Sequence, residues 1–255
     1  MHPIAAEILG TAVLILFGGG VVANVVLNGT KGHRSGWIVI TWGWAMGVFV
    51  AVFIAGQFSG AHINPAVTLG LATAGLFDWA LVIPYSLAQV VGAFLGAVLV
   101  WIAYRDHFAR TNDPVLKLAV FSTAPEVRNP VSNILTETIA TFILVFAVLY
   151  ISDPGFVTAS GDFLEAIEIN GEEVGFGLGS LSALPVGLLV LGIGLALGGP
   201  TGYAINPARD LGPRLAHAAL PIPGKGGSDW RYAWIPVVAP LLGALVAATL
   251  FLILP

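Results

Sequence analysis

Six stretches of this chain are apolar over about 20 residues, the length at which a helix can cross a membrane. They cover Ile4–Leu27, Trp37–Phe58, Leu81–Tyr104, Ile134–Ile151, Leu178–Leu197 and Trp234–Leu254. Inside a bilayer only helices and closed barrels can pair all of their backbone polar groups. The pattern therefore predicts six transmembrane helices.

Two further runs, Val67–Ala74 and Arg209–Ala219, are too short to cross as helices. Each follows the tripeptide Asn-Pro-Ala, which occurs at Asn64-Pro65-Ala66 and again at Asn206-Pro207-Ala208. Asn is a favoured N-cap and Pro suits the first helical position, so both tripeptides read as helix starts. At about 1.5 Å per residue the helices would be roughly 15–20 Å long. We expect half-helices over 64–74 and 206–219 whose N-termini meet near the midplane.

The chain also contains an internal repeat. Glu7 and Thr11 in the first span are matched by Glu137 and Thr141 in the fourth, and each half then supplies its own Asn-Pro-Ala. Three spans per half is an odd number, so the halves must insert with opposite orientation, and such repeats place binding sites at the midplane. We expect one channel domain over 1–255, with repeats over 1–110 and 131–255.

Composition agrees with a membrane protein. Apolar residues make up 57% of the chain, charged residues only 9%, and the mean hydropathy is +0.91. Soluble domains carry far more charge. The absence of cysteine excludes disulfides, thiolate metal sites and a cysteine nucleophile.

Two segments make the pattern specific: Ser59-Gly60-Ala61-His62-Ile63-Asn64-Pro65-Ala66-Val67-Thr68, and the run from Gly202 to Arg214 that contains the second tripeptide. With these the chain resembles the major intrinsic protein family, the aquaporins and glycerol facilitators, over essentially its whole length. The resemblance implies an all-α membrane protein of the aquaporin fold, a multi-pass homotetramer in the cell membrane. It implies a passive channel and not an enzyme, with no cofactor and no nucleic-acid partner.

The half-helix N-termini give the expected pore centre a positive potential, because each carries roughly +0.5 of an elementary charge. Cations would be repelled there. We expect the amide oxygens of Asn64 and Asn206 to cap the helices and their NH₂ groups to face the lumen. Irregular backbone at this depth must line a cavity, so carbonyls are expected to serve as acceptors at Gly60, Ala61, His62, Ile63, Gly202, Tyr203, Ala204 and Ile205. For Gly60 and Gly202, the alternative is that glycine is needed only for the backbone conformation of a turn. The side chain of His62 either packs the loop or contacts the solute.

Charged residues inside the spans are costly and need individual reasons. The resemblance implies that Glu7 and Glu137 hydrogen-bond the backbone of the re-entrant loops; a catalytic carboxylate pair is the alternative. Arg209 lies on the first turn of a half-helix, where the dipole disfavours a cation. In the family the matching arginine forms the narrowest constriction. The acidic side chain of Asp210 is favoured at the same helix N-terminus, where we expect it to be a structural support. It is also expected to form an ion pair with a nearby residue, and Arg214 is a candidate partner. No second ligand cluster accompanies His62, so no metal site is expected.

The resemblance places three other residues at the constriction with Arg209: Trp44, Gly194 and Tyr203. Water-selective relatives usually have His where this chain has Gly194, so we expect a wider, more aromatic pore. Such a pore would conduct glycerol, related small polyols and water while excluding protons and ions. A water-selective aquaporin is the alternative within the family. An ion-coupled secondary transporter or a structural junction protein would be a different class.

Membrane orientation is predicted differently by two arguments. All ten Lys and Arg residues follow the first, third and fifth spans, in loops that the family places outside. The positive-inside rule would place these loops in the cytoplasm; we adopt the family orientation. The 153–177 loop after the fourth span is acidic, with Asp153, Asp162, Glu165, Glu168, Glu172 and Glu173. It is expected to be a solvated connector, with a gate or a divalent-ion site as alternatives.

Overall fold

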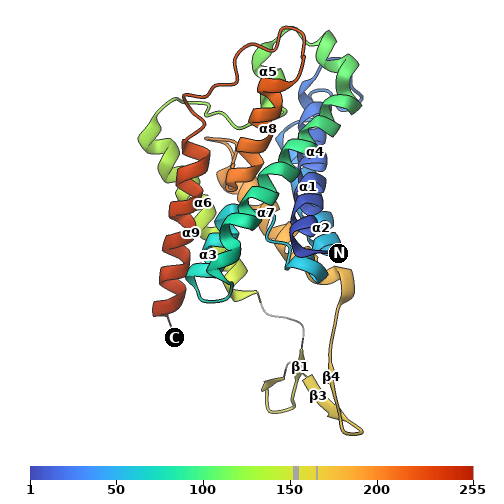
Figure 1. Cartoon of the computed structure of the whole chain (residues 1–255), viewed down its shortest axis with the longest axis vertical. Coiled ribbons are helices and arrows are strands. Elements are labelled where there is room, and N and C mark those ends of the chain that lie inside the picture. Colours follow the sequence, from blue (N-terminus) through green and yellow to red (C-terminus); the bar gives the residue numbers. More distant parts are fainter. Residues whose placement is uncertain (152–154, 165, 255) are drawn as a thin grey trace.

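The computed structural model describes residues 1–151, 155–164 and 166–254, which form a bundle of long helices with a small β extension at one end (Figure 1). The long helices are α1 (Pro3–Val26), α2 (Trp37–Ser59), α4 (Val82–Arg110), α6 (Pro130–Tyr150), α7 (Leu184–Leu197) and α9 (Ile235–Ile253). Short 3₁₀ turns, η1 (Trp79–Leu81) and η2 (Gly179–Ala183), lead into α4 and α7. All six predicted spans are present as helices that are long and apolar enough to cross a membrane.

Two helix boundaries lie outside the predicted spans. Helix α4 continues past Tyr104 to Arg110, with a local kink at Tyr104 (φ −110°, ψ 15°). The apolar run stops at Tyr104 because charged residues follow, yet a helix can continue beyond the hydrocarbon. Helix α6 begins at Pro130, where the side chain of Asn129 caps it by accepting a hydrogen bond from the Ser132 amide at 3.3 Å. The short helix α5 (Pro114–Ala119) was not predicted.

The half-helices α3 (Pro65–Thr73) and α8 (Pro207–Ala219) lie between the long helices. They contain 9 and 13 residues, so each is about 14 to 20 Å long at about 1.5 Å per residue. Both begin at the expected tripeptide, with Asn64 and Asn206 as N-caps. Together they lie at the centre of the bundle, with the long helices around them.

Glycines let the long helices pack closely around this centre. A Cβ atom added to Gly92 or Gly96 of α4 would lie 2.3 Å from the Ile8 carbonyl or 2.4 Å from the Ala12 carbonyl of α1. In the second half, a Cβ added to Gly243 of α9 would lie 2.5 Å from the Thr138 carbonyl of α6. Small residues at such contacts allow helix backbones to approach each other, which is how helices gain packing contacts in lipid.

The acidic connector contains two small antiparallel hairpins that the sequence analysis did not predict. They consist of β1 (Phe156–Val157) with β2 (Phe163–Leu164) and β3 (Ala166–Ile169) with β4 (Glu172–Gly175). In Figure 1 they project from the end of the bundle where both termini lie. The fold is therefore all-helical only within the bundle.

The exposed side chains of Asp162, Glu168, Glu172 and Glu173 belong to this extension, whereas Asp153 and Glu165 lie outside the described residues. Within the described ranges, no group of three or more His, Asp and Glu side chains is arranged to hold a metal ion.

Candidate pore and constriction

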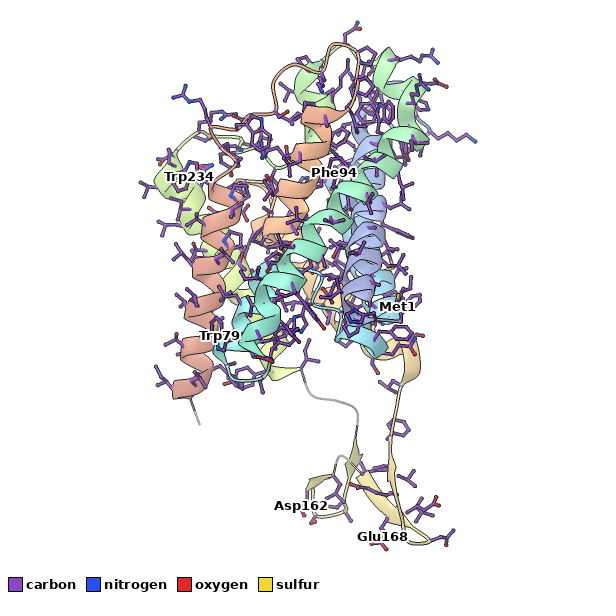
Figure 2. All side chains as sticks on the ribbon, in the orientation of Figure 1. Met1, Trp79, Phe94, Asp162, Glu168 and Trp234 are labelled. Atoms are coloured by element: carbon purple, nitrogen blue, oxygen red, sulfur yellow. The ribbon has the colours of Figure 1, made fainter. Side chains whose placement is uncertain are left out.

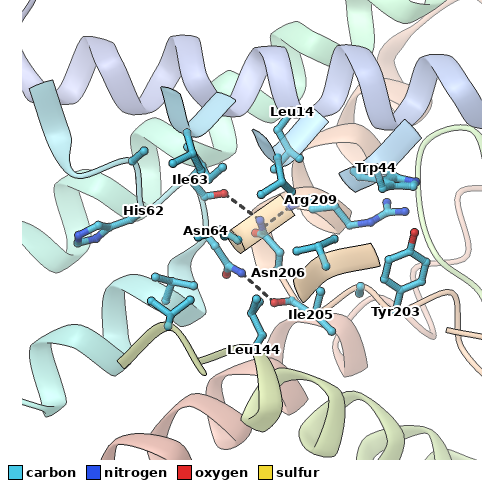
Figure 3. Close-up of a pocket in the computed structure, with 18 of the residues that line it drawn as sticks. Leu14, Trp44, His62, Ile63, Asn64, Leu144, Tyr203, Ile205, Asn206 and Arg209 are labelled. Carbon is cyan, nitrogen blue, oxygen red and sulfur yellow. Dashed lines mark hydrogen bonds between the residues drawn. The ribbon is translucent and has the colours of Figure 1, made fainter. Parts of the chain in front are cut away.

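A cavity of about 140 Å³ runs past the facing ends of α3 and α8. Eleven of the predicted site residues line it: Trp44, Gly60, Ala61, His62, Ile63, Asn64, Tyr203, Ala204, Ile205, Asn206 and Arg209. Figure 3 shows His62 at one end, the two asparagines in the middle, and Trp44, Tyr203 and Arg209 at the other end. One water needs roughly 10–15 Å³ of such space, so the cavity has room for several.

The two asparagines at the centre bind the helix starts and each other's loops. The side-chain oxygen of Asn64 accepts from the Ala66 amide at 2.8 Å, and that of Asn206 accepts from the Ala208 amide at 3.0 Å. Their NH₂ groups cross between the halves: Asn64 Nδ2 donates to the Ile205 carbonyl at 2.9 Å, and Asn206 Nδ2 donates to the Ile63 carbonyl at 2.8 Å. Both NH₂ groups were expected to face the lumen. In the structure one N–H of each NH₂ group donates to the opposite loop, so the second N–H of each group remains for a solute.

The loops before the half-helices have an unusual backbone. Ala61, Ile63, Tyr203 and Ile205 all have positive φ, between 39° and 49°, in addition to Gly60 at 77° and Gly202 at 83°. A positive φ is a genuine outlier for a β-branched residue such as isoleucine. Backbone strain of this kind persists only where the surroundings hold it in place.

In the first half, Glu7 of α1 holds the loop. Its Oε1 accepts from the His62 amide at 3.0 Å and its Oε2 from the Ile63 amide at 2.7 Å. The Ser59 hydroxyl donates to Oε1 at 2.6 Å and Gln89 Nε2 donates to Oε2 at 2.7 Å. Glu7 is fully buried, and these four donors compensate for its removal from water.

Glu137 of α6 has the corresponding place in the second half. Its Oε1 accepts from the Ala204 amide at 2.9 Å and its Oε2 from the Ile205 amide at 2.9 Å. Glu7 and Glu137 each accept from the amides of their own loop, and neither lines the cavity, so neither carboxylate faces a solute as a catalytic group would.

His62 has both of the roles that the sequence left open, since it packs the loop and also lines the cavity. Its ring contacts Phe77 edge to face, with 4.4 Å between centroids. The Thr68 hydroxyl has one proton, which it donates to the Asn64 carbonyl at 3.1 Å, and it accepts from Gln89 Nε2 at 3.0 Å. Nδ1 of His62 lies 3.1 Å from the same Thr68 hydroxyl oxygen. Because the hydroxyl proton is already used, Nδ1 must be the donor in this hydrogen bond. The other ring nitrogen, Nε2, is then a bare acceptor.

Arg209, Trp44 and Tyr203 form the opposite end of the cavity. The guanidinium carbon of Arg209 lies 4.0 Å from the centroid of the Trp44 ring, a cation–π contact. The Trp44 indole N–H and the Tyr203 hydroxyl are buried and have no hydrogen-bond partner among the described residues. The three side chains come from distant parts of the chain and meet at this end of the cavity, which all three residues line.

The space beside Gly194 is occupied by neighbouring side chains. A Cβ atom on Gly194 would lie 2.8 Å from Cζ of Tyr203 and 3.0 Å from Cγ2 of Thr41, and Gly194 does not line the cavity. The indole of Trp37 donates to the Gly194 carbonyl at 3.0 Å and contacts Tyr203 edge to face. The glycine therefore makes room for the Tyr203 ring, and the ring itself forms the wall.

Comparison with known proteins agrees with this architecture. The model of the family described as major intrinsic protein matches residues 1–251. The chain belongs to the major intrinsic protein family. It is 52% identical over 246 residues to a probable glycerol uptake facilitator protein of Thermotoga maritima, covering 96% of each chain. It is 48% identical to a glycerol uptake facilitator protein of Streptococcus pneumoniae, covering 98% of each.

Among solved structures, the X-ray structure of the aquaglyceroporin from Plasmodium falciparum matches with a TM-score of 0.78 and 31% identity. The match covers 98% of this chain and 94% of that one. The expected fold and family are thus confirmed: this is a multi-pass membrane protein of a channel family and not an enzyme.

In this family member Asp210 pairs with Arg214, both fully buried, with 2.7 Å between Oδ1 and Nε. Asp210 Oδ2 also accepts from the backbone and hydroxyl of Thr123, each at 2.8 Å. Arg214 donates to the carbonyls of Thr123 at 2.9 Å and Ser228 at 2.8 Å. The pair thereby ties the first turns of α8, next to Arg209, to two separate loops.

Sequence reasoning missed several residues that position the site. Gly18 of α1 leaves the space that the Trp44 ring fills, because a Cβ there would lie 2.2 Å from the ring. Gln89 connects Glu7 to Thr68, as described above. An apolar wall completes the cavity, with Leu14, Val48, Val52, Val67, Leu71, Leu144, Val148, Val186 and Val190. Nothing distinguishes these residues in the sequence from those that face lipid. Gly202, Pro65, Ala66, Pro207 and Ala208 lie outside the lining.

Proposed function

We propose that this protein is a passive channel that conducts glycerol, related small polyols and water down their gradients. The observation that carries the proposal is the constriction, where Arg209, Trp44 and Tyr203, three side chains with hydrogen-bond donors, line a cavity with an otherwise largely apolar wall. A polyol presents hydroxyl oxygens along one side and a carbon chain along the other, which suits such a wall. Pores of this kind select by diameter and by the hydrogen-bonding groups that line them.

Hydrogen-bond acceptors line the path along both re-entrant loops. We propose that the bare Nε2 of His62 and the carbonyls of the two loops accept hydrogen bonds from solute hydroxyls. Those carbonyls belong to Gly60, Ala61, His62, Ile63, Tyr203, Ala204 and Ile205, whereas Gly202, which was predicted with them, lies outside the lining of the cavity. Glu7 and Glu137 act as structural supports that hold these carbonyls in a strained conformation.

Ions are excluded by charge. The two half-helix N-termini each carry roughly half an elementary charge, and Arg209 adds a full one nearby. Protons are excluded for the same reason, because a hydronium ion is a cation. Neutral solutes meet no such barrier.

The test uses purified protein in liposomes, with water and glycerol fluxes measured by stopped-flow light scattering in one batch. We expect both fluxes to exceed those of empty liposomes, and urea provides a third neutral solute. Water flux without glycerol flux would favour the water-selective alternative. If an uncoupler abolishes uptake, the protein would instead be an ion-coupled secondary transporter. If no solute passes at all, it would be a structural junction protein.

The assembly and orientation are also proposals. We propose a homotetramer with four pores, two inverted repeats in each chain, and the termini on the cytoplasmic side. Cross-linking of the protein in membranes would test the tetramer, since bands beyond four chains, or none beyond one, would contradict it.

A further inference from the structure

A tryptophan outside the pore contacts two of the residues that shape the constriction. Trp37 is the first residue of α2 and is not among the residues that line the cavity. Its ring meets the Tyr203 ring edge to face, with 5.7 Å between centroids and 76° between the ring planes. Its indole N–H donates to the Gly194 carbonyl at 3.0 Å. Trp37 therefore touches both the tyrosine that lines the pore and the glycine that makes room for this tyrosine.

The hydrogen bond fixes the indole against α7. Gly194 is buried and lies in the last turn of this helix, which ends at Leu197. Carbonyls near a helix end accept hydrogen bonds from groups outside the helix. The N–H of Trp37 is such a donor, and it joins the start of α2 to the end of α7. The bond gives the indole ring a defined place beside Tyr203.

A second glycine allows the two rings to meet. A Cβ atom on Gly198, directly after α7, would lie 2.6 Å from Cδ1 of Tyr203 and 2.8 Å from Cζ2 of Trp37. Both rings therefore occupy space that any side chain at this position would need. Closely packed side chains do not move independently of one another. The Tyr203 ring can withdraw from the lumen only as far as Trp37 and α7 allow.

The contact bears on which solutes pass, because a small pore selects partly by its diameter. Trp37 does not line the cavity, so it meets the Tyr203 ring from outside the lumen. Removing the indole would open space behind the ring and leave the lumen side unchanged. The ring could then withdraw further, and the constriction would admit a wider solute. Water needs less width than a polyol, so it would respond less.

We propose that Trp37 is a positioning residue, which limits the width of the constriction by holding the Tyr203 ring and so restricts passage of the longer polyols. The inference rests on the proposed function, since it concerns the solutes of the same pore. It adds to Trp44, Gly194, Tyr203 and Arg209 a residue that acts on the solute only through Tyr203.

The experiment measures fluxes of glycerol, water and xylitol, a longer polyol, by stopped-flow light scattering in liposomes. Trp37→Ala should raise the ratio of xylitol to glycerol flux about fivefold, which corresponds to about 1 kcal/mol of barrier. Water flux should change little. Trp37→Phe keeps an aromatic edge but loses the N–H, and should raise the ratio only about twofold. A flux ratio does not depend on the amount of folded protein, so a merely structural defect would not change it.

The matched control is Trp234→Ala. Trp234 also stands at the start of a transmembrane helix, α9, and is 47% exposed, close to the 40% of Trp37. Figure 2 shows it at the end of the bundle away from the hairpins, and it does not line the pore cavity. We expect the wild-type flux ratio in this control. A ratio in Trp37→Ala equal to that of the control would overturn the proposal. If Trp37→Ala does not fold, the same comparison is made with Trp37→Phe.

A double variant tests whether Trp37 acts through Tyr203. In a Tyr203→Ala background there is no ring to hold, so adding Trp37→Ala should leave the ratio where Tyr203→Ala alone sets it. A further fivefold rise would overturn the proposal, because Trp37 would then act independently of Tyr203. Wild-type liposomes that conduct no glycerol would overturn the proposed function and this inference with it. An unchanged ratio beside a conducting wild type would overturn the inference alone.

Discussion

The ring of Tyr203 occupies the place where Gly194 has no side chain, because a Cβ atom on Gly194 would lie 2.8 Å from Cζ of Tyr203. The glycine and the tyrosine therefore form one unit of the constriction. Tyr203 is also held by the Trp37 ring, with 5.7 Å between centroids. Pore width at this point depends on how far the tyrosine ring can withdraw toward α7.

The first prediction follows from this contact. Gly194→Ala should push the Tyr203 ring into the pore and lower glycerol flux about tenfold, which corresponds to about 1.4 kcal/mol of added barrier. Gly194→His should have a larger effect, and water flux should fall less because water needs less width. Fluxes are compared by stopped-flow light scattering, with Gly192→Ala as control because its added Cβ would meet nothing within 4 Å.

A double variant tests the mechanism of that effect. If Gly194 acts by making room for the ring, Tyr203→Ala in the Gly194→Ala background should restore glycerol flux. Equal slowing of water and glycerol in the Gly194→His variant would instead favour a water-selective channel.

The second prediction concerns the Tyr203 hydroxyl, a buried donor without a protein partner. Tyr203→Phe keeps the ring and its packing but removes one hydrogen-bonding group from the constriction. We expect total flux to remain and the preference among glycerol and longer polyols to change a fewfold, since each hydrogen bond contributes about 0.5–1.5 kcal/mol. Identical polyol ratios in the variant and the wild type would show that the hydroxyl does not contact the solute.

The third prediction concerns the charge of Arg209. Arg209→Val removes the cation that lies 4.0 Å from the Trp44 ring, and should raise proton and cation leak while neutral-solute flux stays measurable. Leak is followed with a pH-sensitive dye in vesicles holding equal amounts of folded protein. Arg110→Val, which changes an exposed arginine at the end of α4, is the control. Leak no greater than in this control would contradict the role of Arg209.

The fourth prediction concerns the buried carboxylates. Glu137→Gln replaces one of the two oxygens that accept the Ala204 and Ile205 amides with an NH₂ group. One amide loses its partner, which costs about 1–3 kcal/mol of stability. The thermal midpoint should fall and glycerol flux should decrease, whereas Glu126→Gln on the exposed surface should change neither. A midpoint equal to that of Glu126→Gln would show that the carboxylate does not support the loop.

The fifth prediction addresses orientation, and the absence of cysteine makes it clean. The loop between α8 and α9, which contains Gly227, and strand β3, which contains Glu168, lie at opposite ends of the molecule (Figure 1). Of single cysteines at these two positions, only one should therefore react with a membrane-impermeant maleimide in intact cells. We expect Gly227→Cys to react. Labelling of Glu168→Cys alone would show that the positive-inside rule determines the orientation of this chain.

Much of the fold follows from local patterns. Apolar runs of the length of a bilayer indicate the spans, and Asn-Pro marks the half-helix starts, because capping and span length depend on residues close together in sequence. Boundaries were predicted less well where a helix leaves the membrane, as α4 does after Tyr104. The hairpins of the acidic connector gave no clear periodic signal, since their strands contain only two to four residues.

The sequence by itself determined that this is a membrane protein, which family it belongs to and which residue types line its pore. Hydropathy and a duplicated motif can be read without three-dimensional information. Only the tertiary structure decided what those residues do to one another. It showed that Asn64 and Asn206 each bind the opposite loop, and that Tyr203 fills the space at Gly194. Such contacts join residues far apart in the chain, and whether a missing side chain leaves a void or admits a neighbour depends on how the helices pack.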